Sequence, residues 1–165
     1  MAAAQTVIPL PPQSTTFSTH ARGFWFTAPA PLVITGLRVP TEASSGPQTI
    51  EVVKFQAAPP AYTGSTNGFT SLFRVVNDAS SGVLPVSIPI ALGDIVGVLG
   101  GRDDVSSEAP APTPITVAGS PVRLMRLGMQ QPLSTTAARD LWTEPVYGIG
   151  RVEVHYQVLP ATPRQ

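Results

Sequence analysis

The sequence has no cysteine, and this absence removes two classes of structure. Without cysteine there is no disulfide framework and no thiolate metal site of the kind that many zinc-binding motifs use. A chain of 165 residues does not need such cross-links, because a domain of this size buries roughly 70% of the surface that its unfolded form exposes. We therefore expect one domain with one sizeable core.

Charge is also scarce. Charged residues make up 12% of the chain, against roughly 25% in an ordinary soluble domain. Ten basic residues balance ten acidic ones, and Lys54 is the single lysine. Nucleic-acid binders need a basic surplus or stripe for their phosphate contacts, so no nucleic-acid partner is expected. A weakly charged surface is tolerated where other subunits cover it, and we therefore expect self-association.

Long hydrophobic runs are missing as well. The most apolar stretch, Val83 to Gly101, contains Pro85, Pro89 and Asp94, which a membrane-spanning helix would not favour. The first twelve residues have neither a basic start nor a long apolar segment, so they do not resemble a signal peptide. We expect no membrane partner.

Proline and glycine, in contrast, are abundant. Nineteen prolines and fourteen glycines divide the chain into short segments, which excludes long helices. The segments between them are rich in Val, Ile, Phe, Thr and Leu, a composition typical of strands. We predict strands over residues 15–20, 22–28, 32–39, 49–56, 69–76, 83–90, 94–99, 114–118, 121–128 and 149–159. Many short strands separated by turn signals indicate an antiparallel sandwich or barrel.

Alternation within these segments predicts which side chains are buried. In the last strand, Val152, Val154, Tyr156 and Val158 share one face, and Arg151, Glu153, His155 and Gln157 share the other. In residues 84–92 the apolar side chains through Leu92 point one way, and two prolines on the other face indicate an edge strand. The predicted core comprises Phe55, Leu84, Val86, Ile88, Val96, Val98, Leu124, Val152, Val154 and Tyr156.

The connections and chain ends complete the predicted organisation. We expect loops at Thr41–Gln48, Ala57–Gly68, Arg102–Pro114 and Met129–Gly148, the last with a helical turn around Ser134–Leu141. The sandwich domain covers residues 14–159, between an extended arm over 1–13 and a tail over 160–165. The arm is uncharged and rich in proline, and Val7, Ile8 and Leu10 are its predicted partner-binding anchors. The alternative is that this segment forms a first strand of the same domain.

The search for reactive groups yields weak candidates. His20 and His155 are the only histidines, and a metal site would need them to meet in space with a carboxylate such as Glu153. Asp103, Asp104 and Glu108 form the densest acidic cluster, but it lacks the D-x-D-x-D-G spacing of a calcium loop, and we interpret it as a solvated loop.

Catalytic motifs are equally weak. There is no G-x-S-x-G nucleophile turn, and Gly97 to Gly101 does not match a phosphate-binding glycine pattern. Two carboxylates such as Glu51 and Glu153 could serve a glycosidase, but nothing in the sequence pairs them. We expect no enzyme activity, no bound metal and no cofactor.

The aromatic residues are compatible with core packing or, in the alternative function, with a binding role. In a strand Trp25 faces away from Phe24 and Phe26, so one set lies in the core and the other is covered by a loop or displayed. Sugar-binding sandwiches display aromatic platforms. The candidate platform residues are Trp25, Tyr62, Trp142 and Tyr147.

Two resemblances extend this interpretation. The alternating strand that runs into Ala91-Leu-Gly-Asp94 and then Ile95-Val-Gly-Val-Leu99 resembles a corner of jelly-roll and tumour-necrosis-factor-like sandwiches. It implies a single jelly-roll-like β-sandwich with a tight turn at Gly93. Further segments are similar to uncharacterised β-sandwich domains of exported bacterial proteins. They are Arg22 to Pro29, Ile34 to Pro40, Asp140 to Glu144 and Arg151 to Glu153.

Two functions follow from these resemblances. A β-sandwich with extended tails and no active site resembles bacteriophage capsid decoration (cement) proteins. This likeness implies a virion structural protein that binds the major capsid protein and itself, as a dimer or trimer, and stabilises the shell. The alternative is an exported carbohydrate- or surface-binding module, located outside the cell or on its surface.

Overall fold

Short alternating segments form two facing sheets in the computed structural model, which describes residues 6–8, 10, 12–18, 21–61, 64–103, 105–110, 115–129, 140–144 and 148–159. The regular secondary structure of the described residues consists of strands, joined by turns and loops, with no helix. Their bounds are β1 Thr6–Val7, β2 Thr15–Ser18, β3 Ala21–Thr27, β4 Leu32–Arg38, β5 Gln48–Phe55, β6 Phe69–Asp78, β7 Leu84–Ile90, β8 Ile95–Arg102, β9 Val105–Ala109, β10 Ile115–Val117, β11 Ser120–Val122, β12 Met125–Met129, β13 Trp142–Glu144, β14 Ile149–Gly150 and β15 Glu153–Val158. No helix in this part of the chain is therefore long and apolar enough to cross a membrane.

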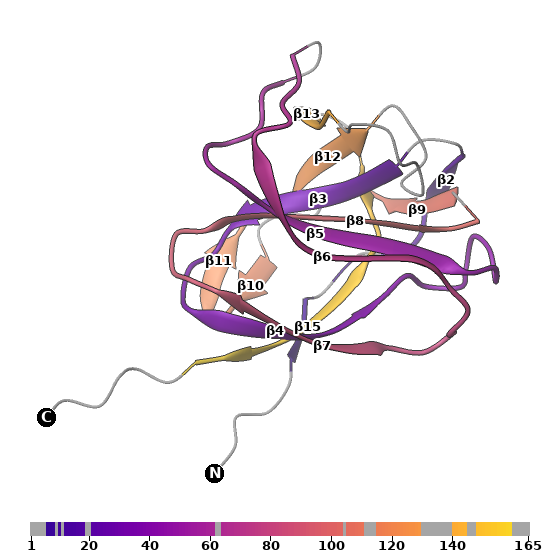
Figure 1. Cartoon of the computed structure of the whole chain (residues 1–165), viewed down its shortest axis with the longest axis horizontal. Helices are drawn as coiled ribbons and strands as arrows, with labels where there is room; N and C mark the ends of the chain where they lie inside the picture. Colours follow the sequence, from indigo (N-terminus) through magenta and orange to yellow (C-terminus); the bar gives the residue numbers. More distant parts are fainter. Residues whose placement is uncertain are drawn as a thin grey trace, which may run out of the picture.

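The strands assemble into an antiparallel β-sandwich, as expected. A four-stranded sheet has the order β1-β15-β4-β7 and forms the lower layer in Figure 1. A nine-stranded sheet forms the upper layer, with the order β13-β12-β3-β8-β5-β6 and with β9, β2 and β14 attached beyond β8. The two-stranded β10-β11 ribbon lies at one side of the two layers (Figure 1).

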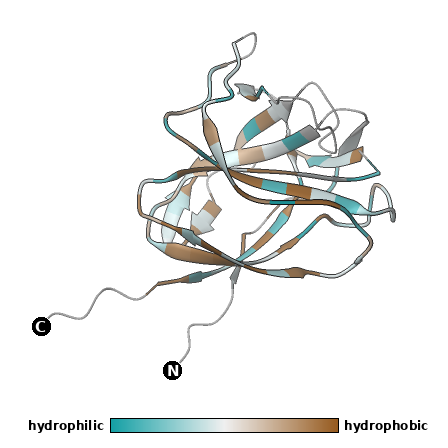
Figure 2. Ribbon diagram, viewed as in Figure 1, coloured by the Kyte–Doolittle hydropathy of each residue, from teal (hydrophilic) through white to brown (hydrophobic). Residues whose placement is uncertain are grey.

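The core lies between the two sheets, where each strand places its alternate apolar side chains. Eight of the ten predicted core residues are buried: Phe55, Ile88, Val96, Val98, Leu124, Val152, Val154 and Tyr156. Leu84 and Val86 are half-buried and pack against the core, because β7 is an edge strand with a neighbour on one side only. Figure 2 shows apolar residues along the strands of both layers.

Several predicted boundaries are wrong. The segment 121–128 is two strands, since β11 pairs with β10 whereas β12 pairs with β3 and β13. The segment 149–159 is also divided, because β14 pairs with β9 in the large sheet and β15 pairs with β4 in the small one. The predicted loops Arg102–Pro114 and Met129–Gly148 contain β9 and β13. Residues 130–139, with most of the predicted helical turn, lie outside the described residues.

The corner at Gly93 has the predicted form. Gly93 adopts a φ of 87°, a left-handed conformation that glycine reaches without a steric penalty. The Asp94 carboxylate accepts a hydrogen bond from the Ala91 amide at 2.8 Å and so caps the turn. Leu92 was expected to point inward, but it is 66% exposed, because the chain has already turned out of the sheet at this position.

The N-terminal segment follows the alternative interpretation, a first strand of the same domain. In β1, Thr6 pairs with Tyr156 of β15, and the Ile8 amide donates to the Val154 carbonyl at 3.0 Å. The Ile8 side chain is only 2% exposed and Leu10 packs against the core, whereas Val7 points to solvent. Residues 6–8 and Leu10 therefore belong to the sandwich rather than to a free arm.

A buried arginine joins the two sheets at one end. Arg102, at the end of β8, is fully buried and donates from Nε to the Val39 carbonyl at 2.7 Å. Its Nη1 donates to the carbonyls of Gly46 and Ser80 at 2.9 and 3.1 Å, and Nη2 donates to Gln48 Oε1 at 3.2 Å. Burial lowers the pKa of this guanidinium below its ordinary value, and the nearby charge of Arg38 lowers it further, while Asp78 opposes the shift.

Candidate functional site

A groove beside Trp25 is the clearest candidate site. Trp25 lies in β3, which is hydrogen-bonded to β12 on one side and to β8 on the other. Alternation sends Phe24 and Phe26 into the core between the sheets and turns Trp25 to the opposite face of the large sheet, where it is half-buried. Trp25 is therefore the one member of this aromatic triplet that reaches the surface.

The indole of Trp25 is held in place by a hydrogen-bond chain. Its Nε1 donates to Thr143 Oγ1 in β13 at 2.9 Å, and that hydroxyl donates to the Arg126 carbonyl in β12 at 2.8 Å. The ring also packs beside a second apolar cluster, formed by Val53, Phe55, Leu99, Leu127 and Leu141. A ring whose polar atom is already bonded within the fold presents only its apolar surface to a ligand.

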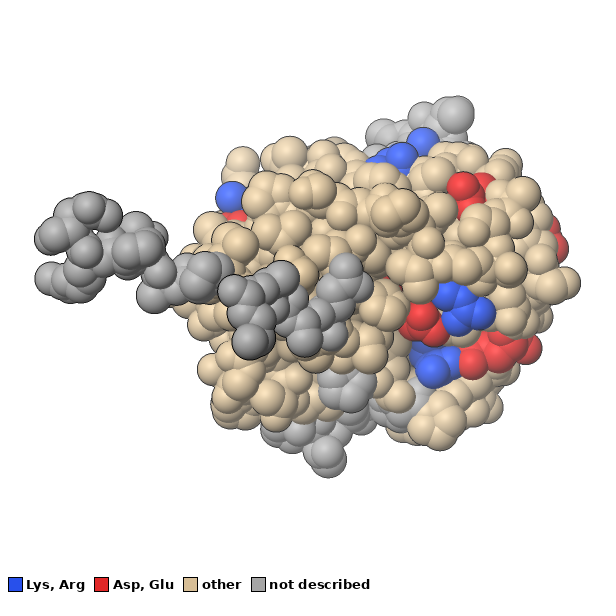
Figure 3. Space-filling view, turned by 90° about the horizontal axis from the view of Figure 1, so that it is seen from below, with Lys and Arg blue, Asp and Glu red and all other residues tan. Residues whose placement is uncertain are grey.

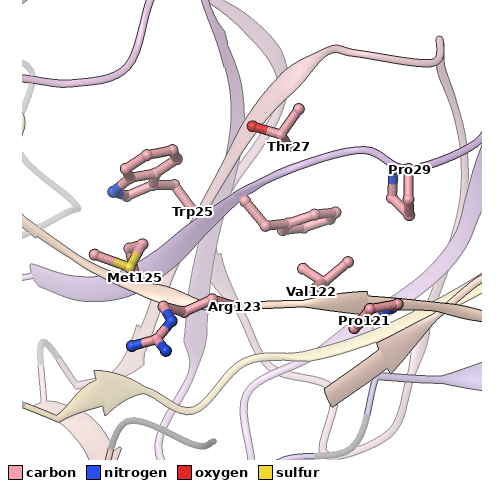
Figure 4. A pocket seen from close by; sticks show the side chains of 8 residues that line it. Trp25, Thr27, Pro29, Pro121, Val122, Arg123 and Met125 are labelled. Atoms are coloured by element: carbon pink, nitrogen blue, oxygen red, sulfur yellow. The ribbon is translucent and has the colours of Figure 1, made fainter. Parts of the chain in front are cut away.

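The groove itself has a volume of about 310 Å³, at the small end of ligand pockets, which span roughly 300–1,000 Å³. Its lining comes from β3, β11, β12 and their connections: Trp25, Phe26, Thr27, Pro29, Pro121, Val122, Arg123 and Met125. In Figure 4 the side chains of Trp25, Met125 and Arg123 gather at one end, and Pro29 and Pro121 lie at the other. We call this site the Trp25 groove.

The other predicted platform residues are not available in this groove. Trp142 is only 5% exposed, because β13 packs its side chain beneath the surface. Tyr62 and Tyr147 lie outside the described residues. Arg123 and Met125 were not predicted from the sequence. The available signal was that Arg123 interrupts an apolar run, Val122 to Leu124, and so marks a side chain that faces away from the core.

The histidine and carboxylate candidates do not form a reactive site. His155 Nε2 lies 3.6 Å from Glu153 Oε2, and the other oxygen of Glu153 is bonded to Arg38 at 2.8 Å. His20 lies outside the described residues. Within the described ranges, no group of three or more His, Cys, Asp or Glu side chains could hold a metal ion.

The acidic cluster matches the predicted solvated loop at Asp103, which is exposed in a turn, but not at Glu108. Glu108 is buried in β9, and its Oε2 lies 2.6 Å from Nη1 of buried Arg126, which also donates to the Gly148 carbonyl at 2.8 Å. Asp103 accepts a hydrogen bond from the Ser44 hydroxyl at 3.0 Å, and Asp104 lies outside the described residues. The carboxylates of Asp103 and Glu108 therefore serve separate structural contacts.

One further polar cluster joins Glu42 and Arg151, which are partly exposed, to the buried Ser107. The Ser107 hydroxyl and the Arg151 guanidinium both donate to the Glu42 carboxylate. A nucleophilic serine needs a base that is itself oriented by a third group, but here the carboxylate is already paired with an arginine. The cluster ties the connection before β5 to β9 and to the segment before β15.

The predicted partner-binding residues of the N-terminus are divided between surface and core. Val7 is exposed beside the edge of the small sheet, whereas Ile8 is buried and Leu10 is partly buried against the core. Of these three side chains, Val7 alone is exposed.

No family model matches the sequence, and no curated protein matches it.

Proposed function

We propose that this chain is a non-catalytic assembly protein that docks onto another protein surface through one uncharged end of the sandwich. The observation that carries this proposal is the separation of apolar and charged side chains to opposite ends of the small sheet. Each end is defined by the strand register of β15, β4 and β7.

The apolar end consists of Pro31, Leu92, Val158 and Leu159, which are all exposed. The register places Val158 beside Leu32 and Leu32 beside Ile90, and the Leu159 amide donates to the Pro31 carbonyl at 3.0 Å. Leu92 follows Ile90 by two residues. Full burial of one such leucine contributes about 1.5–3 kcal/mol, so this end can contribute substantially to an interface.

The charged end lies at the other limit of the same strands. Arg38 of β4 pairs with Glu153 of β15 at 2.8 Å, and Arg151 pairs with Glu42 nearby. Figure 3 looks onto the molecule from below and shows most of the red and blue side chains of this face at the right, with a small blue and red group at the left edge and blue atoms at the top. Near the apolar end, Asp94 follows Leu92 by two residues, and its carboxylate is paired with Lys54 at 3.3 Å.

The assembly that we propose, by analogy of architecture, is a bacteriophage capsid shell, with the chain as a decoration protein that binds the major capsid protein and itself. The all-β sandwich and the apolar end support this proposal. A protein that binds the outside of a shell and holds its subunits together needs a stable scaffold and a weakly charged contact surface. Dimers or trimers would place several apolar ends on one shell.

The test uses undecorated shells of a major capsid protein encoded in the same gene neighbourhood. Co-sedimentation should show binding by the intact chain and loss of at least tenfold in affinity for Leu92→Glu and Leu159→Glu. Val83→Glu is the matched control, since Val83 is also exposed but precedes β7 at the charged end. Equal binding by all variants, or a gene neighbourhood without capsid genes, would refute this function.

A second function, carbohydrate binding by an exported module, is favoured by one observation. The Trp25 groove offers a half-buried, fixed indole in a cavity of ligand size. Glycan-array binding that is lost in Trp25→Ala but retained in Leu92→Glu would support this second function and separate it from the first.

A further inference from the structure

Arg123 is unusual among the basic residues that the structure describes. The guanidinium is exposed and makes no hydrogen bond or ion pair with the described residues. All the other described basic residues have a partner within the fold: Arg22, Arg38, Lys54, Arg74, Arg102, Arg126 and Arg151. A chain with few charges thus leaves one described cation available for an external anion, at the rim of the Trp25 groove.

The lining of the groove is compatible with an anion. None of its eight residues is acidic, and Thr27 is the only neutral one with a polar side-chain oxygen. Arginine binds a carboxylate through two parallel hydrogen bonds, an arrangement that lysine cannot match. The Arg123 guanidinium therefore selects a planar carboxylate over a neutral group.

The other lining residues of the groove indicate which class of molecule carries that carboxylate. Trp25 and Met125 are direct neighbours across the β3–β12 pair and lie at the same end as Arg123 (Figure 4). Because the Trp25 Nε1 is bonded to Thr143, the indole offers stacking and no donor. The apolar face of a sugar ring fits such a surface, and its carboxylate would extend toward Arg123.

An extended peptide fits the site less well. Peptides that bind sheet proteins commonly add a strand to an unpaired edge. Here β8 pairs with β3 as far as Thr27, and β12 covers the other edge of β3 up to the Trp25–Met125 pair. Only the short stretch Phe26–Thr27 has an edge without a β12 partner, which is too short for a full added strand. Binding must therefore rely mainly on side chains, as the recognition of a sugar by stacking and one ion pair does.

We propose that the Trp25 groove binds an acidic sugar, with the pyranose ring stacked on Trp25 and its carboxylate paired with Arg123. This inference rests on the second function above and names its ligand class. It is independent of docking through the apolar end.

The experiment measures binding of two uronate oligomers, oligogalacturonate and oligomannuronate, by titration calorimetry with the full chain. Their methyl esters and a neutral galactose oligomer are the comparison ligands. At least one uronate should bind, its methyl ester should bind at least tenfold more weakly, and Arg123→Gln should lose at least tenfold for the acid but not for the ester. Lys54→Gln, which removes an equal charge from another exposed site, should change affinity by less than about twofold.

Each of the other possible results contradicts a different part of the proposal. Equal binding of acid, ester and neutral oligomer would overturn the acidic ligand while leaving sugar binding intact. Failure of every sugar at millimolar concentration would overturn both. Binding of a peptide Ala-Pro-Ala-Pro-Thr-Pro, the sequence of residues 109–114, without any sugar binding would assign the groove to proline-rich segments instead. Trp25→Phe, which keeps a stacking ring, should retain part of the uronate affinity, and an unchanged affinity in Trp25→Ala would also refute the assignment.

Discussion

Replacement of Arg102 by leucine should destabilise the protein without changing its fold. The guanidinium donates to four acceptors, and two of them, the Val39 carbonyl and Gln48 Oε1, are buried. Gln48 Oε1 retains a second donor, the Val39 amide at 2.9 Å. The largest energetic cost of the replacement therefore falls on the Val39 carbonyl. The carbonyls of Gly46 and Ser80 lie in partly exposed segments, where water can replace the arginine.

The magnitude follows from these contacts. The buried Val39 carbonyl loses the Arg102 donor at a cost of about 1–3 kcal/mol, and the three other lost hydrogen bonds, whose acceptors keep a second donor or gain water, cost about 0.5–1.5 kcal/mol each. Burial of the leucine side chain returns part of this, so we expect a net loss of about 2–4 kcal/mol from a total stability of about 5–15 kcal/mol. For a domain of this length the midpoint of thermal unfolding should fall by about 4–16 °C.

Urea denaturation followed by tryptophan fluorescence measures this loss. Arg38→Leu is the control, because that side chain is partly exposed and its ion pair with Glu153 should contribute less than about 1 kcal/mol. Arg102→Lys should be intermediate, since one ammonium cannot reach acceptors on four residues. Buried ionic groups can be replaced by apolar ones at no cost in some proteins. An Arg102→Leu variant as stable as the parent would show that this is such a case and would refute the reasoning.

Three further predictions concern stability. Gly23→Ala should cost more than about 4 kcal/mol or prevent folding, because its new Cβ would lie 1.8 Å from a backbone carbonyl oxygen of β8; circular dichroism of the purified variant checks this, and native-like melting would contradict it. Glu108→Gln should cost about 3–5 kcal/mol by leaving the buried charge of Arg126 unpaired, and Glu108→Gln combined with Arg126→Met should recover part of that loss in urea denaturation. Deletion of residues 1–13 should remove about 1.5–3 kcal/mol through the loss of buried Ile8, so an unchanged melting temperature would restore the idea of a free arm.

Alternation predicted the core well because it is a local signal. Val152, Val154 and Tyr156 repeat every second residue, and a strand with one buried face requires that repeat. The same signal failed for β9, whose sequence Val105-Ser-Ser-Glu-Ala109 resembles a polar loop. Its serines and glutamate are buried because Arg126 and the neighbouring strands β2 and β14 provide partners that lie far away in the sequence.

The Trp25 groove illustrates the same limit. Trp25 was identifiable because two core phenylalanines flank it. Its neighbour Met125 is about a hundred residues away in the chain, and only the antiparallel register of β3 and β12 brings them together. Arg123 becomes a candidate ligand-binding residue because the other described arginines have partners within the fold. Those contacts depend on the complete tertiary structure and are not visible in the sequence.

The pairing of the last strand with the earliest ones has a consequence for synthesis on the ribosome. β15 is the central link of the small sheet, since it joins β1 on one side to β4 on the other. During translation, β4 can pair with β7 on one edge, but its other edge stays unpaired until a partner more than a hundred residues downstream is made. Such distant pairings slow folding and prolong exposure to aggregation. The nascent chain should thus depend on holding chaperones until Val158 has left the exit tunnel, and ribosome-stalled chains that end before β15 should remain sensitive to protease.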